Sequence, residues 1–555
     1  MNDEHQASMN ELRTVVFMCN WGPHAAFQTL QDNCAPIPPQ VRMIRIPCTG
    51  RISKSLLFRA FEMGADGVAL VGCEPGSCRY GSGTPAAVSN IDDTRGILEL
   101  LGLGKDRLQL ATCLPDESQK LLAFLLEFHR DIERLGKNPV TPPAARRSHD
   151  SHECALASGY SPDDKDRTRE KMQGIASQLL ARHDVYACQD CGKCSSACPL
   201  ALVGKPFSPR GVANAVISGC VDAPAVIRDT WSCLTCGTCY DRCPSAVTFP
   251  EFIRDLRELQ ANSGIHGHQA HDGFFQSLMR TMASPGLTIQ HWQGLPDDVH
   301  TDSHSKLLFF GGCAPYFDAF FKHHLGTRTT DILVDSLRLL NFFDIHPRLL
   351  AGERCCGHDL LWSGDQSNFL RLAALNAEMI AADGIEEVVT ACPECYWTLS
   401  RDYAACGIDV PFKVTHLYEL VEREIDKGAV AFERLNQNLT FQDSCRLNRL
   451  EEGASLPRKL LHRLQPKSFK EMRDHGKAAI CCGNCAWTGC DRYSKALQVK
   501  RLQQARDTGS DLLVTACPKC QVHLRCAMED PILGSELQME MLDLASVLAR
   551  TIHWE

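Results

Sequence analysis

The sequence predicts a mixed protein of the α/β and α classes, in which two α/β regions flank a helical one. Three observations carry this prediction. Short apolar, β-rich runs alternate with helical patterns over residues 12–136 and again over 306–550, whereas helical signals dominate 171–262. The last region is also duplicated, because VTACPEC at 389–395 recurs as VTACPKC at 514–520. Since strands that alternate with helices form parallel sheets, we expect such a sheet in each α/β region.

Length, charge and cysteine count limit the class of protein. A chain of 555 residues is long enough for about three or four domains. Its formal net charge of −9 gives no basic surface for nucleic acid. We find neither an apolar run of the roughly 18 residues that span a membrane nor a secretory signal, so we expect a soluble, cytoplasmic protein. Thirty cysteines in such a protein indicate metal binding or redox chemistry, because cytosolic thiols are kept reduced.

The first region, 12–136, is predicted to form an α/β domain. Its last helix, at about 119–135, has apolar residues at helical spacing and stops at Gly136. Four predicted strands end in or near a cysteine, at Cys19, Cys48, Cys73 and Cys113. Ligand sites in parallel sheets collect at the carboxyl ends of strands, so we expect these thiols to lie near one another.

Three stretches of this domain, CNWGPHAA (19–26), RIPCTGRI (45–52) and GVALVGCEPGSCRYGSG (67–83), resemble the delta subunit of methyl-viologen-reducing hydrogenase, a small 2Fe–2S electron carrier. That family usually shows CNWC, and Gly22 replaces its second cysteine. Four cysteines still suffice for one 2Fe–2S cluster. The resemblance implies these ligands: Cys19, Cys48, Cys73 and Cys78. The alternative is a domain that has lost its cluster and only docks a partner.

Two stretches are predicted as linkers. Residues 137–170 are rich in Pro, Ser, Ala and charge, and Cys154 within them has no partner at ligand spacing. Residues 263–305 contain Gly, Pro and scattered histidines. The spacing HGHQAH could indicate a metal site, but no cysteine or carboxylate pattern supports one, so a solvated connection is favoured.

The middle region, 171–262, repeats the spacing Cys-x2-Cys-x2-Cys-x3-Cys-Pro. This is the bacterial ferredoxin signature, in which the fourth cysteine of each run binds the other cluster. We therefore expect one cubane 4Fe–4S cluster on Cys188, Cys191, Cys194 and Cys243, and a second on Cys233, Cys236, Cys239 and Cys198. Zinc is a weaker alternative, because it favours paired Cys-x2-Cys elements. A helix is predicted from Ser208 and Pro209 to Gly219, and the region resembles the heterodisulfide reductase C subunit.

The two halves of the last region, 306–430 and 431–550, share one cysteine order: a lone Cys, then Cys-Cys-Gly, then Cys-Pro-x-Cys. The glycine allows a tight turn after the paired cysteines. We expect two α/β halves related by a pseudo-twofold axis, with their cysteine loops pointing to a shared region. The ten cysteines are Cys313, Cys355, Cys356, Cys392 and Cys395 in the first half, and Cys445, Cys481, Cys482, Cys517 and Cys520 in the second.

These motifs resemble the heterodisulfide reductase B subunit and iron–sulfur subunits of the glycolate oxidase type. The resemblance implies that each half holds a non-cubane 4Fe–4S cluster on its five cysteines, and that these ten residues are catalytic in disulfide chemistry. Most other cysteines are predicted to be buried structural thiols. They are Cys34, Cys113, Cys154, Cys220, Cys406, Cys485, Cys490 and Cys526. Cys485, in CCGNC, could approach the cluster but is not counted as a ligand.

The order of these modules predicts an electron relay from a 2Fe–2S carrier through two cubane clusters to two sites that reduce or form a disulfide. No GxGxxG follows a predicted strand, so we expect no flavin in this chain. The resemblance implies a hetero-oligomer with a flavoprotein like the heterodisulfide reductase A subunit, or with a hydrogenase or dehydrogenase. The alternatives are a pure electron-transfer subunit of a dehydrogenase complex and, more weakly, a structural zinc scaffold.

Overall fold

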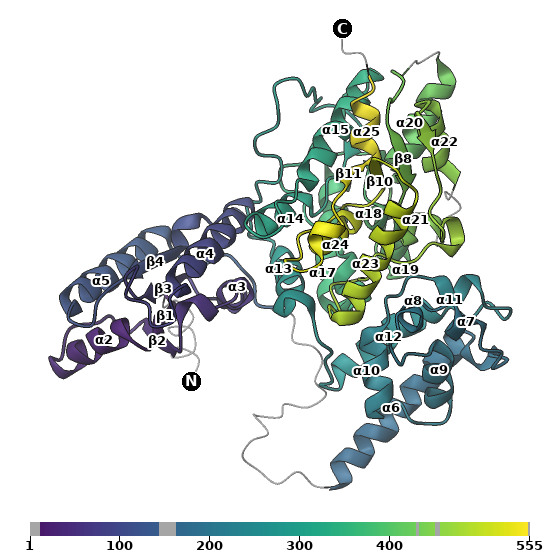
Figure 1. Cartoon of the computed structure of the whole chain (residues 1–555). Coiled ribbons are helices and arrows are strands. Elements are labelled where there is room, and N and C mark those ends of the chain that lie inside the picture. The colour runs from purple at the N-terminus through teal and green to yellow at the C-terminus, as the bar shows by residue number, and fades with distance from the viewer. Residues whose placement is uncertain (1–11, 144–161, 429–431, 450–454, 553–555) are drawn as a thin grey trace.

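A computed structural model of the protein describes residues 12–143, 162–428, 432–449 and 455–552. It has mixed α/β architecture with parallel sheets and many helices. Figure 1 shows an N-terminal α/β domain and a helical domain against different sides of the duplicated C-terminal domain. Within the described residues, no helix combines the length and the apolar character that a membrane crossing requires.

The N-terminal domain is a four-stranded parallel sheet in the order β2-β1-β3-β4. Side chains alternate between its faces: Val16 packs with the helices α2 and α5, and Phe17 faces α3 and α4. Gly136 ends α5 with φ of 69°, as the sequence predicts. The elements are β1 (Thr14–Cys19), α2 (Gly22–Asp32), β2 (Val41–Ile46), α3 (Lys54–Glu62), β3 (Gly67–Gly72), α4 (Gly83–Leu100), β4 (Leu108–Thr112) and α5 (Ser118–Leu135).

The second domain is entirely helical among the described residues. Ser208 caps its helix α9 by accepting a hydrogen bond from the Gly211 amide at 3.0 Å, so the predicted helix start is confirmed. Helix α6 begins at Pro162, inside the stretch predicted as a linker, and Cys154 lies outside the described residues. The helices are α6 (Pro162–Arg182), α7 (Lys193–Ser196), α8 (Pro199–Leu202), α9 (Pro209–Ile217), α10 (Pro224–Ser232), α11 (Thr238–Asp241) and α12 (Phe249–Asn262).

The connection between the second and third domains is not the solvated segment that the sequence predicts. It contains helix α13 (Phe274–Met282), in which Phe274, Phe275 and Leu278 are buried. Helix α13 packs against α3 of the N-terminal domain and against α17 of the duplicated domain. The prediction fails because the flanking Gly, Pro and His residues look loop-like, while a short aromatic helix between them fills an interdomain space. The ring of His271 lies in the same region, 5.3 Å from that of Phe320.

The duplicated domain contains two parallel sheets with a matching order. In each half, the strand before the lone cysteine pairs with the strand before Cys-Pro-x-Cys, and the latter pairs with a third strand. Strand β9 pairs with β8, and in the first half a single bridge from Leu308 to Arg348 stands in its place. The strands are β5 (Leu307–Phe309), β6 (Glu387–Thr390) and β7 (Lys413–His416), then β8 (Asn438–Phe441), β9 (Ser468–Phe469), β10 (Leu512–Thr515) and β11 (Glu540–Asp543).

Corresponding helices follow corresponding strands in the two halves. One helix precedes β6 in the first half and β10 in the second. Another helix follows β7 in the first half and β11 in the second. Helices α15 and α25 pack together across the halves. The helices of this domain include α14 (Ala314–Phe321), α15 (Thr329–Phe342), α16 (His358–Trp362), α17 (Gln366–Ala382), α18 (Pro393–Trp397), α20 (Leu417–Lys427), α21 (Cys445–Asn448), α23 (Arg492–Asp507), α24 (Pro518–Met528) and α25 (Leu544–Ala549).

The N-terminal domain docks on the first half of the duplicated domain. Helix α4 packs against α14, and Lys54 forms a buried ion pair with Asp93 while donating to the Phe320 carbonyl at 2.6 Å. His323 Nδ1 lies 2.6 Å from the other oxygen of Asp93. The N-terminal domain therefore contacts the duplicated domain directly, although the helical domain lies between them in the sequence.

Candidate metal centres

The four thiols predicted in the N-terminal domain meet at the carboxyl edge of its sheet. Cys19 ends β1 and Cys73 directly follows β3, and their sulfur atoms are 3.6 Å apart. Cys48 and Cys78 form a second hydrogen-bonded pair, and Cys48 also interacts electrostatically with Cys73. A Cβ atom at Gly83 would lie 2.6 Å from the Cys48 sulfur, so the start of α4 closes against the thiols without a side chain.

Gly22, where the delta-subunit resemblance leads one to expect a cysteine, is enclosed by backbone. A Cβ atom there would meet the Cys113 carbonyl oxygen at 3.0 Å. Cys113 itself follows β4 and interacts with Cys73, and burial raises the pKa of its thiol to about 12. Cys113 is therefore a further buried thiol beside the four-sulfur group, as its position at a strand end suggests.

In the helical domain, one predicted set of four cysteines surrounds a cavity. Cys198 joins it from the first run, which is the exchange of the fourth cysteine that the ferredoxin signature predicts. Burial raises the pKa of Cys198 and of Cys233 to about 12, so these thiols suit a metal centre that takes up the thiolate charge. We call these four residues the inner set: Cys198, Cys233, Cys236 and Cys239.

The other predicted set is more open. Cys194 interacts with Cys188, and Cys191 is exposed at the surface. Cys243 follows α11 and packs against the core of the helical domain. Cys194 also interacts with Cys239, so the two sets are neighbours. We call this group the outer set: Cys188, Cys191, Cys194 and Cys243.

The ten cysteines of the duplicated domain form two five-thiol groups with the same connectivity. Hydrogen bonds between sulfurs join them in one order in each half. We call the five-thiol group of the first half the first cage, and that of the second half the second cage. In the first cage the order is Cys313, Cys355, Cys356, Cys395 and Cys392. In the second cage it is Cys445, Cys481, Cys482, Cys520 and Cys517. Cysteines at equivalent positions of the two sequence repeats therefore occupy equivalent places in the two cages.

One thiol of each Cys-Cys pair has a lowered pKa, which favours the thiolate form that binds metal. Hydrogen bonds from Cys313 and Cys356 hold the pKa of Cys355 well below its usual range. In the second cage, hydrogen bonds from Cys481 and Cys520 lower the pKa of Cys482 to about 6. These five-sulfur groups therefore fit a thiolate-bound iron–sulfur centre.

The glycine after each Cys-Cys pair has the positive φ that the sequence predicts, 86° at Gly357 and 106° at Gly483. A Cβ atom would lie 2.8 Å from the Phe369 ring at Gly357 and 2.7 Å from the Ser494 carbonyl oxygen at Gly483. The tight turn brings the amide of Gly357 within 3.5 Å of the Cys355 sulfur. Each glycine is therefore required both by its conformation and by the space around it.

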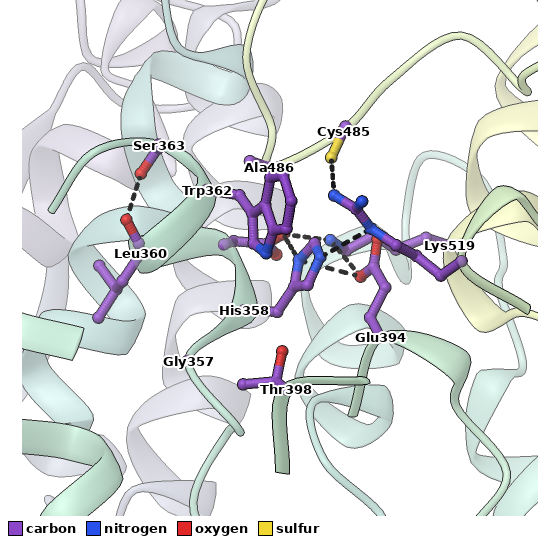
Figure 2. A network of polar contacts seen from close by, with 12 residues as sticks. Gly357, His358, Leu360, Trp362, Ser363, Glu394, Thr398, Cys485, Ala486 and Lys519 are labelled. Atoms are coloured by element: carbon purple, nitrogen blue, oxygen red, sulfur yellow. Dashed lines mark hydrogen bonds and ion pairs between the residues drawn. The ribbon is translucent and has the colours of Figure 1, made fainter. Parts of the chain in front are cut away.

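A buried polar centre lies between the two cages, which face each other through Cys392 and Cys517. Figure 2 shows His358, Glu394 and Lys519 pointing toward one another. Glu394 and Lys519 occupy the variable position of Cys-Pro-x-Cys in the two halves, and their charged atoms are 2.6 Å apart. Lys519 also pairs with Asp359. Burial alone would raise the pKa of Asp359, but Lys519 holds that pKa far below its usual range.

Models of three known families match four parts of the chain. The family described as methyl-viologen-reducing hydrogenase, delta subunit, matches residues 14–136. A 4Fe–4S dicluster domain matches 187–247, and a cysteine-rich (CCG) domain matches twice, at 307–400 and 439–525. The iron–sulfur D subunit of the F420-non-reducing hydrogenase vhu from Methanocaldococcus jannaschii is 31% identical over 126 residues, which are 23% of this chain and 94% of that protein.

Two longer relatives cover the other domains. The D subunit of dihydromethanophenazine:CoB–CoM heterodisulfide reductase from Methanosarcina acetivorans is 29% identical over 286 residues, 49% of this chain and 67% of the relative. The chain therefore combines a hydrogenase delta-subunit domain, a 4Fe–4S dicluster domain and two CCG domains, and it is similar to this heterodisulfide reductase subunit. The B subunit of fumarate reductase (CoM/CoB) from Methanothermobacter marburgensis is 26% identical over 390 residues, 70% of this chain. The chain spans 65% of the length of that relative.

Sequence reasoning missed the polar residues around the cysteines. Glu394, Lys519 and Asp359 each occupy a variable position beside a motif, so no spacing rule identifies them. Cys485, which the sequence analysis does not count as a ligand although it could approach the cluster, lies buried between Arg446 and Thr235. The Thr235 hydroxyl donates to its sulfur at 3.0 Å. The one signal in the sequence is that Cys485 extends the second Cys-Cys-Gly to CCGNC.

Proposed function

We propose that this protein is an iron–sulfur electron-transfer subunit whose two cages reduce or form a disulfide with electrons relayed through its own clusters. The observation that carries the proposal is the presence of two complete five-thiol cages with equal connectivity, facing each other through Cys392 and Cys517. The name of the Methanosarcina relative assigns heterodisulfide reduction to that protein, and this agrees with the proposal.

The proposed cofactors are two cubane 4Fe–4S clusters on the inner and outer sets, two non-cubane 4Fe–4S clusters on the cages, and one 2Fe–2S cluster on the N-terminal cysteines. When bound, these clusters would supply one-electron storage and iron sites for sulfur. The residues of the chain hold the thiolates and limit the access of water, because four cysteines of the second cage are buried and Cys445 is half-buried. Reduction of a disulfide takes up two electrons and two protons and releases two thiols.

Two carriers would deliver electrons to the cages from different sides. The inner set lies next to the second cage, since Cys236 interacts with Cys481. The N-terminal domain rests on α14, which directly follows Cys313 of the first cage. We propose that a flavoprotein, hydrogenase or dehydrogenase supplies the electrons in a hetero-oligomer. Anaerobic purification of the tagged chain from its native host would recover that partner.

Release of thiols tests the proposed reaction. We expect the chemically reduced protein to release two thiols per disulfide consumed when it is mixed with small-molecule heterodisulfides. The control is protein from which the iron has been removed and whose free thiols have then been alkylated, so that thiol–disulfide exchange is blocked; it should release none. If the iron-loaded protein releases no thiol from a broad panel of disulfides but still passes electrons to a dye acceptor, the alternative of a pure electron-transfer subunit holds.

Replacement of Cys78 by alanine tests the N-terminal cluster. Because Cys78 belongs to the four-sulfur group, we expect the Cys78→Ala variant to contain about two fewer iron atoms per chain and to lose the 2Fe–2S paramagnetic signal. The matched control is Cys34→Ala, since Cys34 is exposed at the end of α2. Equal iron content and an equal signal in wild type and Cys78→Ala would support the alternative in which this domain only docks a partner.

A further inference from the structure

Three buried arginines hold the loop that carries the inner set. Arg257 comes from α12 of the helical domain, whereas Arg446 and Arg449 follow Cys445 of the second cage. Their exposed fractions are 0%, 1% and 9%. Each donates to a carbonyl of the loop: Arg257 to Cys233, Arg446 to Thr235 at 3.1 Å, and Arg449 to Cys236 at 3.2 Å. We call these three arginines the clamp. The clamp joins the second cage to the inner set.

The positive charge of this clamp has no carboxylate counter-charge within ion-pair distance among the described residues. Arg257 and Arg446 donate to carbonyl, hydroxyl, imidazole and thiol groups, while the Nη2 atom of Arg449 has no hydrogen-bond partner. A buried guanidinium without a counter-ion is strongly disfavoured. Glu394 and Asp402 interact with Arg446 only from beyond ion-pair distance, so a closer anion is needed to balance these charges.

The thiolates supply that anion. Arg257 interacts with Cys233, and both Arg446 and Arg449 interact with Cys445. Arg446 also lies 3.4 Å from the Cys485 sulfur. Four thiolates make a bound 4Fe–4S cluster anionic, and one further negative charge is added when it is reduced. Buried positive charge beside such a cluster favours the reduced state, because Coulomb interactions are weakly screened in the interior.

The outer set has no comparable clamp among the described residues. The guanidinium beside its loop belongs to Arg210, which donates to the Asp190 carbonyl at 3.2 Å. Arg210 is 42% exposed at its side chain and pairs with the Asp190 carboxylate at 3.4 Å. Solvent and Asp190 therefore screen its charge. The two sets differ in local electrostatics although their cysteine spacing is identical.

We propose that Arg257, Arg446 and Arg449 are positioning residues that raise the reduction potential of the inner cluster above that of the outer cluster. Electrons from the outer cluster then collect on the inner one, beside the second cage. This inference rests on the cluster ligands in the proposed function, and it holds whether or not the cages act on a disulfide.

The test is a potentiometric titration of the full-length, iron-loaded Arg446→Gln variant, followed by paramagnetic resonance. We expect the reduced-to-oxidised ratio of the inner cluster to fall at least tenfold at a fixed potential, or about 59 mV for a one-electron couple. The outer cluster should be unchanged, and a Cys191→Ser variant identifies its signal. Arg446→Lys should restore part of the ratio, because the charge is kept while the planar fork is lost. Arg210→Gln is the matched control.

An unchanged ratio at full iron content, or an equal shift of both clusters, would overturn the proposal. If Arg446→Gln does not retain iron in the inner set, Arg449→Gln replaces it, since the Nη2 atom of Arg449 bonds to no protein group. Loss of inner-set iron in both variants would also overturn the proposal, because it would assign the arginines to folding of the loop. The titration uses no disulfide, so its result does not depend on the outcome of the thiol-release assay.

Discussion

Replacing Cys482 with serine is expected to remove iron from the second cage and to lower disulfide turnover at least about a hundredfold. Loss of a residue that merely supports a metal ligand already costs about 10–100-fold, and Cys482 is itself a proposed ligand. It occupies the middle of the sulfur order, between Cys481 and Cys520, and His523 Nδ1 lies 3.2 Å from its sulfur. Iron analysis and thiol release measure the effect.

Cys526→Ser is the control for this change, because Cys526 lies on α24 of the same half but outside the cage. It should retain iron and turnover. The equivalent change in the first half is Cys356→Ser, and comparison of the two variants shows which cage reacts. Full turnover in either variant, with its cage iron lost, would remove that half from the proposed chemistry.

Replacing Lys519 with methionine is expected to destabilise the duplicated domain by about 3–5 kcal/mol. Lys519 is 4% exposed and pairs with Glu394 and Asp359, so its loss leaves two buried carboxylates without their main counter-charge. The energy comes mostly from these unpaired charges, not from the strength of the pair itself. The midpoint of urea denaturation, followed under anaerobic conditions by circular dichroism, reports the change.

A double-variant cycle isolates the Glu394–Lys519 pair. The combination of Glu394→Gln with Lys519→Met should cost less than the sum of the single changes, since the uncharged amide needs no ammonium beside it. Lys477→Met is the matched control: Lys477 is 67% exposed and lies 3.6 Å from Asp241, so its loss should cost less than about 1 kcal/mol. Equal costs for Lys519→Met and Lys477→Met would refute the assigned role of the pair.

The cysteine pattern predicted much of the candidate site, because ligand thiols must occur at restricted spacings and follow the ends of strands. The convergence of Cys19 with Cys73, and of Cys198 with the second ferredoxin run, follows from those rules. Helix α13 could not be predicted in the same way. Its nine residues are too few for a firm periodic signal. Their side chains are buried only because the helix packs between two domains.

The charged groups around the clusters were beyond sequence reasoning for a different reason. Arg257 and Arg446 are 189 positions apart, and each alone has the pattern of an ordinary surface arginine. Their meeting depends on how the helical domain packs on the second half, through the carbonyls of Cys233 and Thr235. Such a contact belongs to tertiary packing, and a spacing rule along the chain carries no information about it.

The opposite charges at Glu394 and Lys519 have a consequence for the history of the domain. The two residues stand at equivalent positions of a repeat, and they meet each other near its centre. A dimer of two copies of the first half would bury two carboxylates at that point, and a dimer of two copies of the second half would bury two ammonium groups, which is strongly unfavourable. The ion pair therefore favours packing of the first half against the second half of the same chain. It disfavours packing of either half against a copy of itself.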